Sequence, residues 1–232
     1  MNNKILLMLQ LQNKLNNATN GDKWTDGLTK NGKSIDWRRC IYMECAEMVD
    51  SFPWKHWKSI SAEPDWHNHQ IEVVDVWHFI MSLLIEEYYR DMQGGVEDIA
   101  SDISELPALS LIENADNSFA AQEKVMEKIE DLMRHALSKE KLDKEGLVKD
   151  FFALTAMSGL NLDTLYRLYV GKNILNQFRQ DNGYKDGSYI KVWDGDEDNV
   201  VMKRIWEEHE SLKPDELYKE LAKAYFSLTK SV

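Results

Sequence analysis

The sequence predicts an all-α protein, folded as a helical bundle. Its 232 residues contain only 4 prolines, apolar side chains recur at the period of amphipathic helices, and no stretch shows the convincing alternation of a strand. Hydrophobic residues form 43% of the chain and charged residues 29%, which is ordinary for a protein with a packed core. We expect one domain over residues 1–232, with residues 96–145 as a candidate variable helical insertion.

Three helices are expected in the N-terminal part. The first covers about residues 3–17, and a loop rich in Gly, Asn, Asp and Thr follows it. The second begins at a cap provided by Ser34 or Asp36 and ends at a Ser-Phe-Pro sequence, because proline interrupts a helix. The third runs over about residues 68–92 and ends at two consecutive glycines.

The remainder of the chain is also predicted to be helical, apart from two segments. Residues 96–117 are acidic and weakly patterned, so no element is assigned to them. Asn161 is expected to cap the helix that follows it, and Pro214 suits the first turn of a helix. The expected elements are helices over about 119–137, 144–158 and 161–180, a loop rich in Gly, Asp and Asn over 181–199, and two closing helices, the last beginning at Pro214.

Composition limits the classes of function. A net charge of −12 argues against binding to extended nucleic acid, although it leaves a nucleotide substrate open. No apolar run approaches the roughly 20 residues that span a bilayer, and the apolar start is too short for a secretion signal. Cys40 and Cys45 would turn apart on one helix, so no disulfide is expected. We expect a cytoplasmic protein with no membrane partner.

Four carboxylates form two matched pairs. Glu44 and Glu47 lie three residues apart on the second expected helix, and Glu72 and Asp75 on the third, so each pair shares a helical face with apolar neighbours. Such faces point inward, where four carboxylates need cations beside them. An all-oxygen set suits Mg²⁺. We predict a Mg²⁺ site for phosphate chemistry, with Glu47 also accepting the proton of water; two solvated helix faces are the alternative.

The two pairs, ExxE and then ExxD, resemble the metal motif of the all-α NTP pyrophosphatases, a superfamily that includes the dimeric dUTPases. The resemblance to dimeric dUTPases covers roughly residues 5–92 and 160–200. It implies Mg²⁺-dependent hydrolysis of dUTP, and also of dUDP, to dUMP by a dimeric helical bundle, with pyrophosphate released from dUTP. Further blocks that carry the resemblance are residues 37–40, 51–58, 171–180, 182–193 and 197–199.

A second group of residues suits the phosphates of a nucleotide. Lys172, Asn176 and Arg179 lie at i, i+4 and i+7 of one expected helix. Arginine can bind phosphate oxygens in a bidentate manner, lysine supplies a point charge and asparagine orients oxygens. A solvated basic helix end is the alternative. The resemblance to dUTPases assigns phosphate binding to six residues: Lys172, Asn176, Arg179, Tyr184, Lys191 and Asn199.

A third group suits the nucleoside. Gln12 and Asn16 continue the core-facing stripe of the first helix, where their amides either bond within the bundle or face a ligand. The resemblance to dUTPases favours uracil and deoxyribose recognition by these amides. It also places Trp54 at the wall of the base pocket, where packing is the alternative. Lys58 is a weaker candidate contact. His78 is also placed on this side, because Mg²⁺ seldom binds imidazole, and a packing role or one behind the metal ligands is the alternative.

Two other functions remain open from the sequence. A relative acting on dCTP and dCDP, or on non-canonical nucleotides, would differ by little more than a turned amide in the base pocket. A helical interaction module that holds only a structural metal would release no pyrophosphate from any nucleotide. The group of Lys172, Asn176 and Arg179 disfavours the second alternative.

Overall fold

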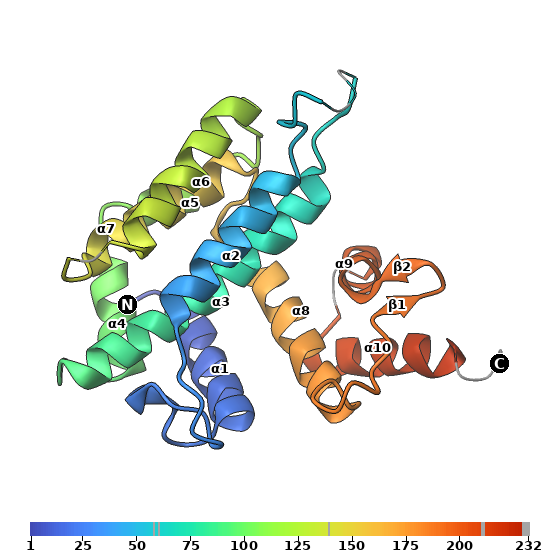
Figure 1. Ribbon diagram of the computed structural model, residues 1–232, viewed down its shortest axis with the longest axis horizontal. Helices are drawn as coiled ribbons and strands as arrows, with labels where there is room; N and C mark the ends of the chain where they lie inside the picture. Colours follow the sequence, from blue (N-terminus) through green and yellow to red (C-terminus); the bar gives the residue numbers. More distant parts are fainter. Residues whose placement is uncertain (58, 60, 139, 210–211, 229–232) are drawn as a thin grey trace. The chain divides into compact units, whose positions relative to one another are not determined.

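The all-α prediction is confirmed by a computed structural model that describes residues 1–57, 59, 61–138, 140–209 and 212–228 (Figure 1). Within these residues, the only strands are two short ones. The elements are α1 (Asn3–Asn20), the 3₁₀-helix η1 (Trp24–Asp26), α2 (Trp37–Asp50), α3 (Trp66–Arg90), α4 (Val96–Glu105), α5 (Leu109–Glu113), α6 (Gln122–Ala136), α7 (Lys144–Met157), α8 (Leu162–Asp181), β1 (Val192–Trp193), β2 (Asp196–Glu197), α9 (Asp198–Glu208) and α10 (Pro214–Leu228).

Side-chain caps explain where several helices begin. The Asp36 carboxylate accepts a hydrogen bond from the Arg39 amide at 3.0 Å, so of the two predicted caps Asp36 is the one that starts α2. Asp65 does the same for α3, and Asp143 for α7. The predicted cap of α8 is confirmed, because Asn161 Oδ1 accepts hydrogen bonds from the backbone amides at 163 and 164.

The chain divides into two compact units, Met1–Tyr166 and Arg167–Val232, which are described separately. The expectation of one domain with an insertion at residues 96–145 stays a prediction. In the first unit, α2 and α3 pack along one another (Figure 1). Helix α6 packs against α2, α7 against α6, and α1 against both α3 and α4. Trp77 of α3 stacks in parallel on Phe151 of α7 at 4.7 Å between ring centroids, in the middle of this core.

The acidic segment without an assigned element contains two helices. Ile99, Ala100 and Ile103 are buried along α4, which packs against α1, and Leu109 and Ile112 are buried along α5. These helices are too short for their apolar spacing to stand out in the sequence. Docking on the rest of the unit stabilises them, since isolated helices of this length are marginal in water.

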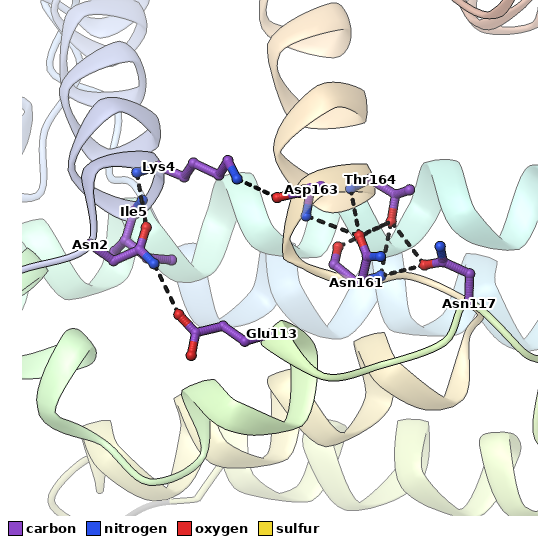
Figure 2. A network of polar contacts seen from close by, with 8 residues as sticks. All are labelled: Asn2, Lys4, Ile5, Glu113, Asn117, Asn161, Asp163 and Thr164. Atoms are coloured by element: carbon purple, nitrogen blue, oxygen red, sulfur yellow. Dashed lines mark hydrogen bonds and ion pairs between the residues drawn. The ribbon is translucent and has the colours of Figure 1, made fainter.

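A polar network holds the first turn of α8 (Figure 2). Asn117, which has a left-handed backbone with φ of 62°, accepts a hydrogen bond from the Asn161 amide at 2.8 Å. The Lys4 ammonium of α1 pairs with the Asp163 carboxylate of α8. The capping turn is therefore tied to two segments that are distant in the sequence.

The second unit is organised around an aromatic cluster. The rings of Tyr189, Trp193, Tyr218 and Tyr225 lie 5.3–6.3 Å from that of Phe178, between ring centroids. Strands β1 and β2 form an antiparallel hairpin in which Val192 pairs with Glu197 and Trp193 with Asp196. The expected loop over 181–199 thus contains a hairpin whose two-residue strands are too short for alternation to reveal.

None of the helices in the described residues is long and apolar enough to cross a membrane.

Candidate active site

Three of the four predicted metal ligands lie together. Glu44 comes from α2, and Glu72 and Asp75 come from α3; one carboxylate oxygen of each lies within 4.8 Å of those of the other two. The packing of α2 along α3 and the i, i+3 spacing on α3 bring them to one place. Glu72 is 8% exposed, and the other two are half-buried. Three carboxylates so close together repel one another strongly unless a proton or a cation intervenes.

Burial and this repulsion act together on Glu44. Burial raises the pKa of Glu44 to about 8, and the negative charges of Asp75, Glu72 and Glu47 contribute to the rise. Glu47 is exposed and is not part of the close group, although its charge reaches Glu44. Burial also raises the pKa of the Cys45 thiol far above its usual range, so this buried cysteine is a packing residue rather than a nucleophile.

The predicted nucleoside-side amides form a buried network with His78. Gln12 Oε1 lies 2.6 Å from His78 Nδ1, and Gln12 Nε2 donates to Asn16 Oδ1 at 3.1 Å. Both amides donate to the Ser82 hydroxyl, at 3.0 Å from Gln12 and 2.9 Å from Asn16. Ser82 in turn donates to the His78 carbonyl at 2.8 Å. Sequence reasoning missed Ser82; its place four residues after His78 on α3 was the available signal.

The other two nucleoside-side candidates follow α2. Trp54 is 45% exposed and contacts Trp57 edge to face at 5.9 Å between ring centroids. Lys55 lies over the Trp54 ring at 5.4 Å from its centroid. An exposed indole can offer a face to a ligand, which an indole packed in the core cannot. Lys58 lies outside the described residues.

In the second unit, four of the six predicted phosphate contacts are joined by hydrogen bonds. Arg179 donates from Nη1 to Asn176 Oδ1 at 3.1 Å and from Nη2 to Asn199 Oδ1 at 3.3 Å. Lys172 Nζ donates to the same Asn199 oxygen at 2.8 Å. An amide oxygen of α9 therefore bridges two cations of α8, and Lys172 and Arg179 are both buried.

The other two predicted phosphate contacts are exposed. The Arg179 guanidinium lies over the Tyr184 ring, 5.7 Å from its centroid, which links Tyr184 to the cationic group. Lys191 pairs with Glu197 across the hairpin at 3.3 Å, so the structure shows it in a surface ion pair.

Asp198 is a central residue of this cluster that sequence reasoning did not single out. Its carboxylate accepts hydrogen bonds from Nε and Nη2 of Arg179, both at 2.7 Å, and it is fully buried. A carboxylate repels phosphate, so an acidic residue is not expected in a phosphate-binding group. For this reason Asp198 was not selected from the sequence. Only the fold shows that it pairs with an arginine.

A family model described as dUTPase matches residues 4–184. The chain belongs to the dUTPase family. The resemblance seen in the sequence is thereby confirmed, and the chain is a dUTP diphosphatase, a hydrolase of nucleotide metabolism, rather than a non-enzymatic interaction module. No curated protein matches the chain.

The family assignment gives the acidic group a meaning. dUTPases of this family generally depend on a metal, and Glu44, Glu72 and Asp75 could bind one. The match includes α1 from its second residue, all of α2 and α3, and nearly all of the candidate residues, and it ends at Tyr184. Lys191, Asp198 and Asn199 lie beyond the matched residues, so their assignment rests on the contacts described above and on the sequence resemblance.

Proposed function

We propose that this dUTPase hydrolyses dUTP, and also dUDP, to dUMP in a Mg²⁺-dependent reaction, with Glu44, Glu47, Glu72 and Asp75 as the metal ligands. The observation that carries this proposal is the convergence of the Glu44, Glu72 and Asp75 oxygens within 4.8 Å. From dUTP the reaction also releases pyrophosphate. We further propose that the enzyme works as a homodimer in the cytoplasm.

The residues fit Mg²⁺ by their chemistry. All the donors are carboxylate oxygens, which are the ligands that this ion prefers over nitrogen and sulfur. A partly buried group of like charges is costly by itself, so it favours a divalent cation over an empty state. When bound, Mg²⁺ lowers the pKa of a water molecule and neutralises negative charge on phosphate oxygens.

Glu47 is the residue to which we assign proton transfer. It lies one turn from Glu44 on α2 and is exposed, so water reaches its carboxylate. A carboxylate within hydrogen-bond reach of an attacking water can accept its proton as the bond to phosphorus forms. Glu44, Glu72 and Asp75 would bind the metal only, whereas Glu47 would both bind the metal and accept the proton.

The remaining candidates have roles in binding. We assign the phosphates to Lys172, Asn176, Arg179, Tyr184, Lys191 and Asn199, since guanidinium, ammonium, amide and hydroxyl groups together neutralise and orient phosphate oxygens. We assign the nucleoside to Gln12, Asn16, Trp54, Lys58 and His78. Amides suit uracil because its two carbonyls and one N–H need both donors and acceptors.

Pyrophosphate release tests the proposal. We expect release from dUTP in the presence of Mg²⁺, its loss when a chelator is added, and its return when Mg²⁺ is restored. In parallel assays, dUDP should yield phosphate, and dCTP should be a poor substrate. Hydrolysis of dUTP that persists in chelator would refute the metal requirement, and a preference for dCTP would refute the uracil assignment. Light scattering of the purified protein with and without dUTP tests the dimer.

A further inference from the structure

The carboxylate of Asp198 holds one edge of the Arg179 guanidinium. Its two oxygens accept hydrogen bonds from Nε and Nη2, each at 2.7 Å, so the two planar groups meet in the bidentate geometry that arginine favours. Asp198 is fully buried at the start of α9, and the Arg179 side chain is 10% exposed. Neither group can exchange its partner for bulk water, so this pair keeps the guanidinium in one orientation.

A tyrosine holds the carboxylate from the other side. The Tyr189 hydroxyl donates to Asp198 Oδ2 at 2.8 Å, which makes three hydrogen bonds to one buried carboxylate. The Tyr189 ring stacks in parallel on Tyr225 of α10, with 5.2 Å between centroids and an interplanar angle of 8°. The Tyr225 hydroxyl accepts a hydrogen bond from the Ile190 amide at 3.1 Å. The last helix of the chain thereby supports the residue that orients Asp198.

The fixed edge determines where the rest of the guanidinium points. Its Nη1 donates to Asn176 and its Nη2 to Asn199, both of which are proposed phosphate contacts. The Asp198 carboxylate itself would repel a phosphate, because like charges at short range destabilise one another. A favourable effect of Asp198 on nucleotide binding therefore has to be indirect, and Arg179 is the proposed phosphate contact that its carboxylate holds.

We propose that Asp198 is a positioning residue of this dUTPase, which orients Arg179 toward the substrate phosphates and is itself oriented by Tyr189. The inference rests on the proposed function, because it requires that Arg179 contacts phosphate. The competing explanation is a purely structural ion pair that joins α8 to α9 and has no part in the turnover of dUTP.

A double-mutant cycle on kcat/KM for dUTP measures whether Asp198 acts through Arg179, and the inhibition constant of pyrophosphate then separates a positioning role from a structural one. The variants are Asp198→Asn, Arg179→Met and the double variant. We expect Asp198→Asn to lower kcat/KM about tenfold to a hundredfold, since a misplaced binding group costs about this much. In the Arg179→Met background, Asp198→Asn should have almost no further effect.

Inhibition by pyrophosphate gives a readout that a structural defect would not move. Loss of correctly folded enzyme lowers kcat but leaves KM and the inhibition constant of pyrophosphate unchanged. Loss of an oriented phosphate contact raises both KM and that constant. We expect Asp198→Asn and Arg179→Met to raise the inhibition constant of pyrophosphate by similar factors.

Two further variants complete the design. Asp196→Asn is a matched control, because Asp196 forms an exposed pair with Arg204 at 2.8 Å only two residues away, and its loss should leave kcat/KM unchanged. Tyr189→Phe keeps the ring on Tyr225 and removes only the hydroxyl, so it tests the proposal even if Asp198→Asn does not fold. We expect it to lower kcat/KM several-fold, and to do nothing further in the Arg179→Met background.

The outcomes distinguish this inference from the proposed function. If Arg179→Met leaves kcat/KM for dUTP unchanged, the phosphate role proposed for Arg179 fails, and the inference fails with it. If Arg179→Met is impaired while Asp198→Asn and Tyr189→Phe are as active as Asp196→Asn, only the inference is overturned. Independent, multiplicative effects of Asp198→Asn and Arg179→Met would also overturn it.

Discussion

His69 Nε2 and Ser158 Oγ lie 2.7 Å apart in the core of the N-terminal unit, although 89 residues separate them in the sequence. Ser158 also donates to the Leu154 carbonyl at 2.7 Å, so the hydroxyl is committed to the end of α7 and accepts from the imidazole. Both side chains are fully buried. This contact connects the first turn of α3 to the turn that follows α7, and the burial of the imidazole makes the unit sensitive to acid.

Acid should destabilise the protein through His69. Burial lowers the pKa of His69 to about 4 from its usual 6.5, and the Met48 backbone offsets part of this shift. The pKa of His69 is lower in the folded than in the unfolded protein. Its contribution to the free energy of unfolding is therefore fully present above pH 6.5 and is lost as the pH falls toward 4. Between pH 7 and pH 5 this group alone should remove about 2 kcal/mol from the free energy of unfolding.

Urea unfolding at pH 7 and pH 5 checks this prediction. We expect His69→Gln to be less stable than the wild type at pH 7, because it loses ring packing. Between pH 7 and pH 5 its free energy of unfolding should nevertheless fall by about 2 kcal/mol less than that of the wild type, because it has no imidazole to protonate. An equal pH dependence in the two proteins would contradict the assignment to His69.

Asp75→Asn should separate metal binding from folding. Removing one charge from the group of Glu44, Glu72 and Asp75 relieves repulsion, so the variant should be at least as stable as the wild type in chelator. The rise in unfolding temperature on adding Mg²⁺ should shrink, because fewer ligands bind the ion. Differential scanning fluorimetry measures both values. Glu127→Gln, which alters an exposed carboxylate of α6, is the control and should retain the full Mg²⁺ shift.

Glu47→Gln should abolish turnover of dUTP while leaving the fold intact. The side chain is exposed on α2, so its replacement disturbs little packing, but an amide cannot accept the proton of water. Pyrophosphate release and far-UV circular dichroism are the measurements. Near-normal turnover would defeat the proton-acceptor assignment, whatever the state of the metal site.

Ser82→Ala should weaken both the core and nucleoside binding. The hydroxyl accepts from the amides of Gln12 and Asn16, and burying polar groups without their partner costs about 1–3 kcal/mol. We expect a fall of that size in the free energy of unfolding and a higher KM for dUTP, because the two amides lose their orientation. Ser110→Ala, at an exposed hydroxyl, is the control. If the variant is as stable as the wild type and has a normal KM, the hydroxyl of Ser82 is needed neither for the core nor for substrate recognition.

Local pattern predicted much of the fold and part of the candidate site. The helix over Gln122–Ala136 and the caps Asp36 and Asn161 were expected because periodicity and capping are properties of neighbouring residues. The meeting of Glu44 with Glu72 and Asp75 was also expected, since three-residue spacing sets a face and a helical pair brings two faces together. α4 and α5 were missed because their stability comes from docking on distant segments.

The sequence by itself determined that this protein is built from helices and that each acidic pair lies on one helical face, because both follow from the dihedral angles and spacing within a few turns. The tertiary structure alone decided which buried polar groups became partners: Ser82 for the two amides, Asp198 for Arg179, and Ser158 for His69. A buried polar group must find a partner wherever the chain brings one, and that choice depends on packing between segments that can lie many residues apart.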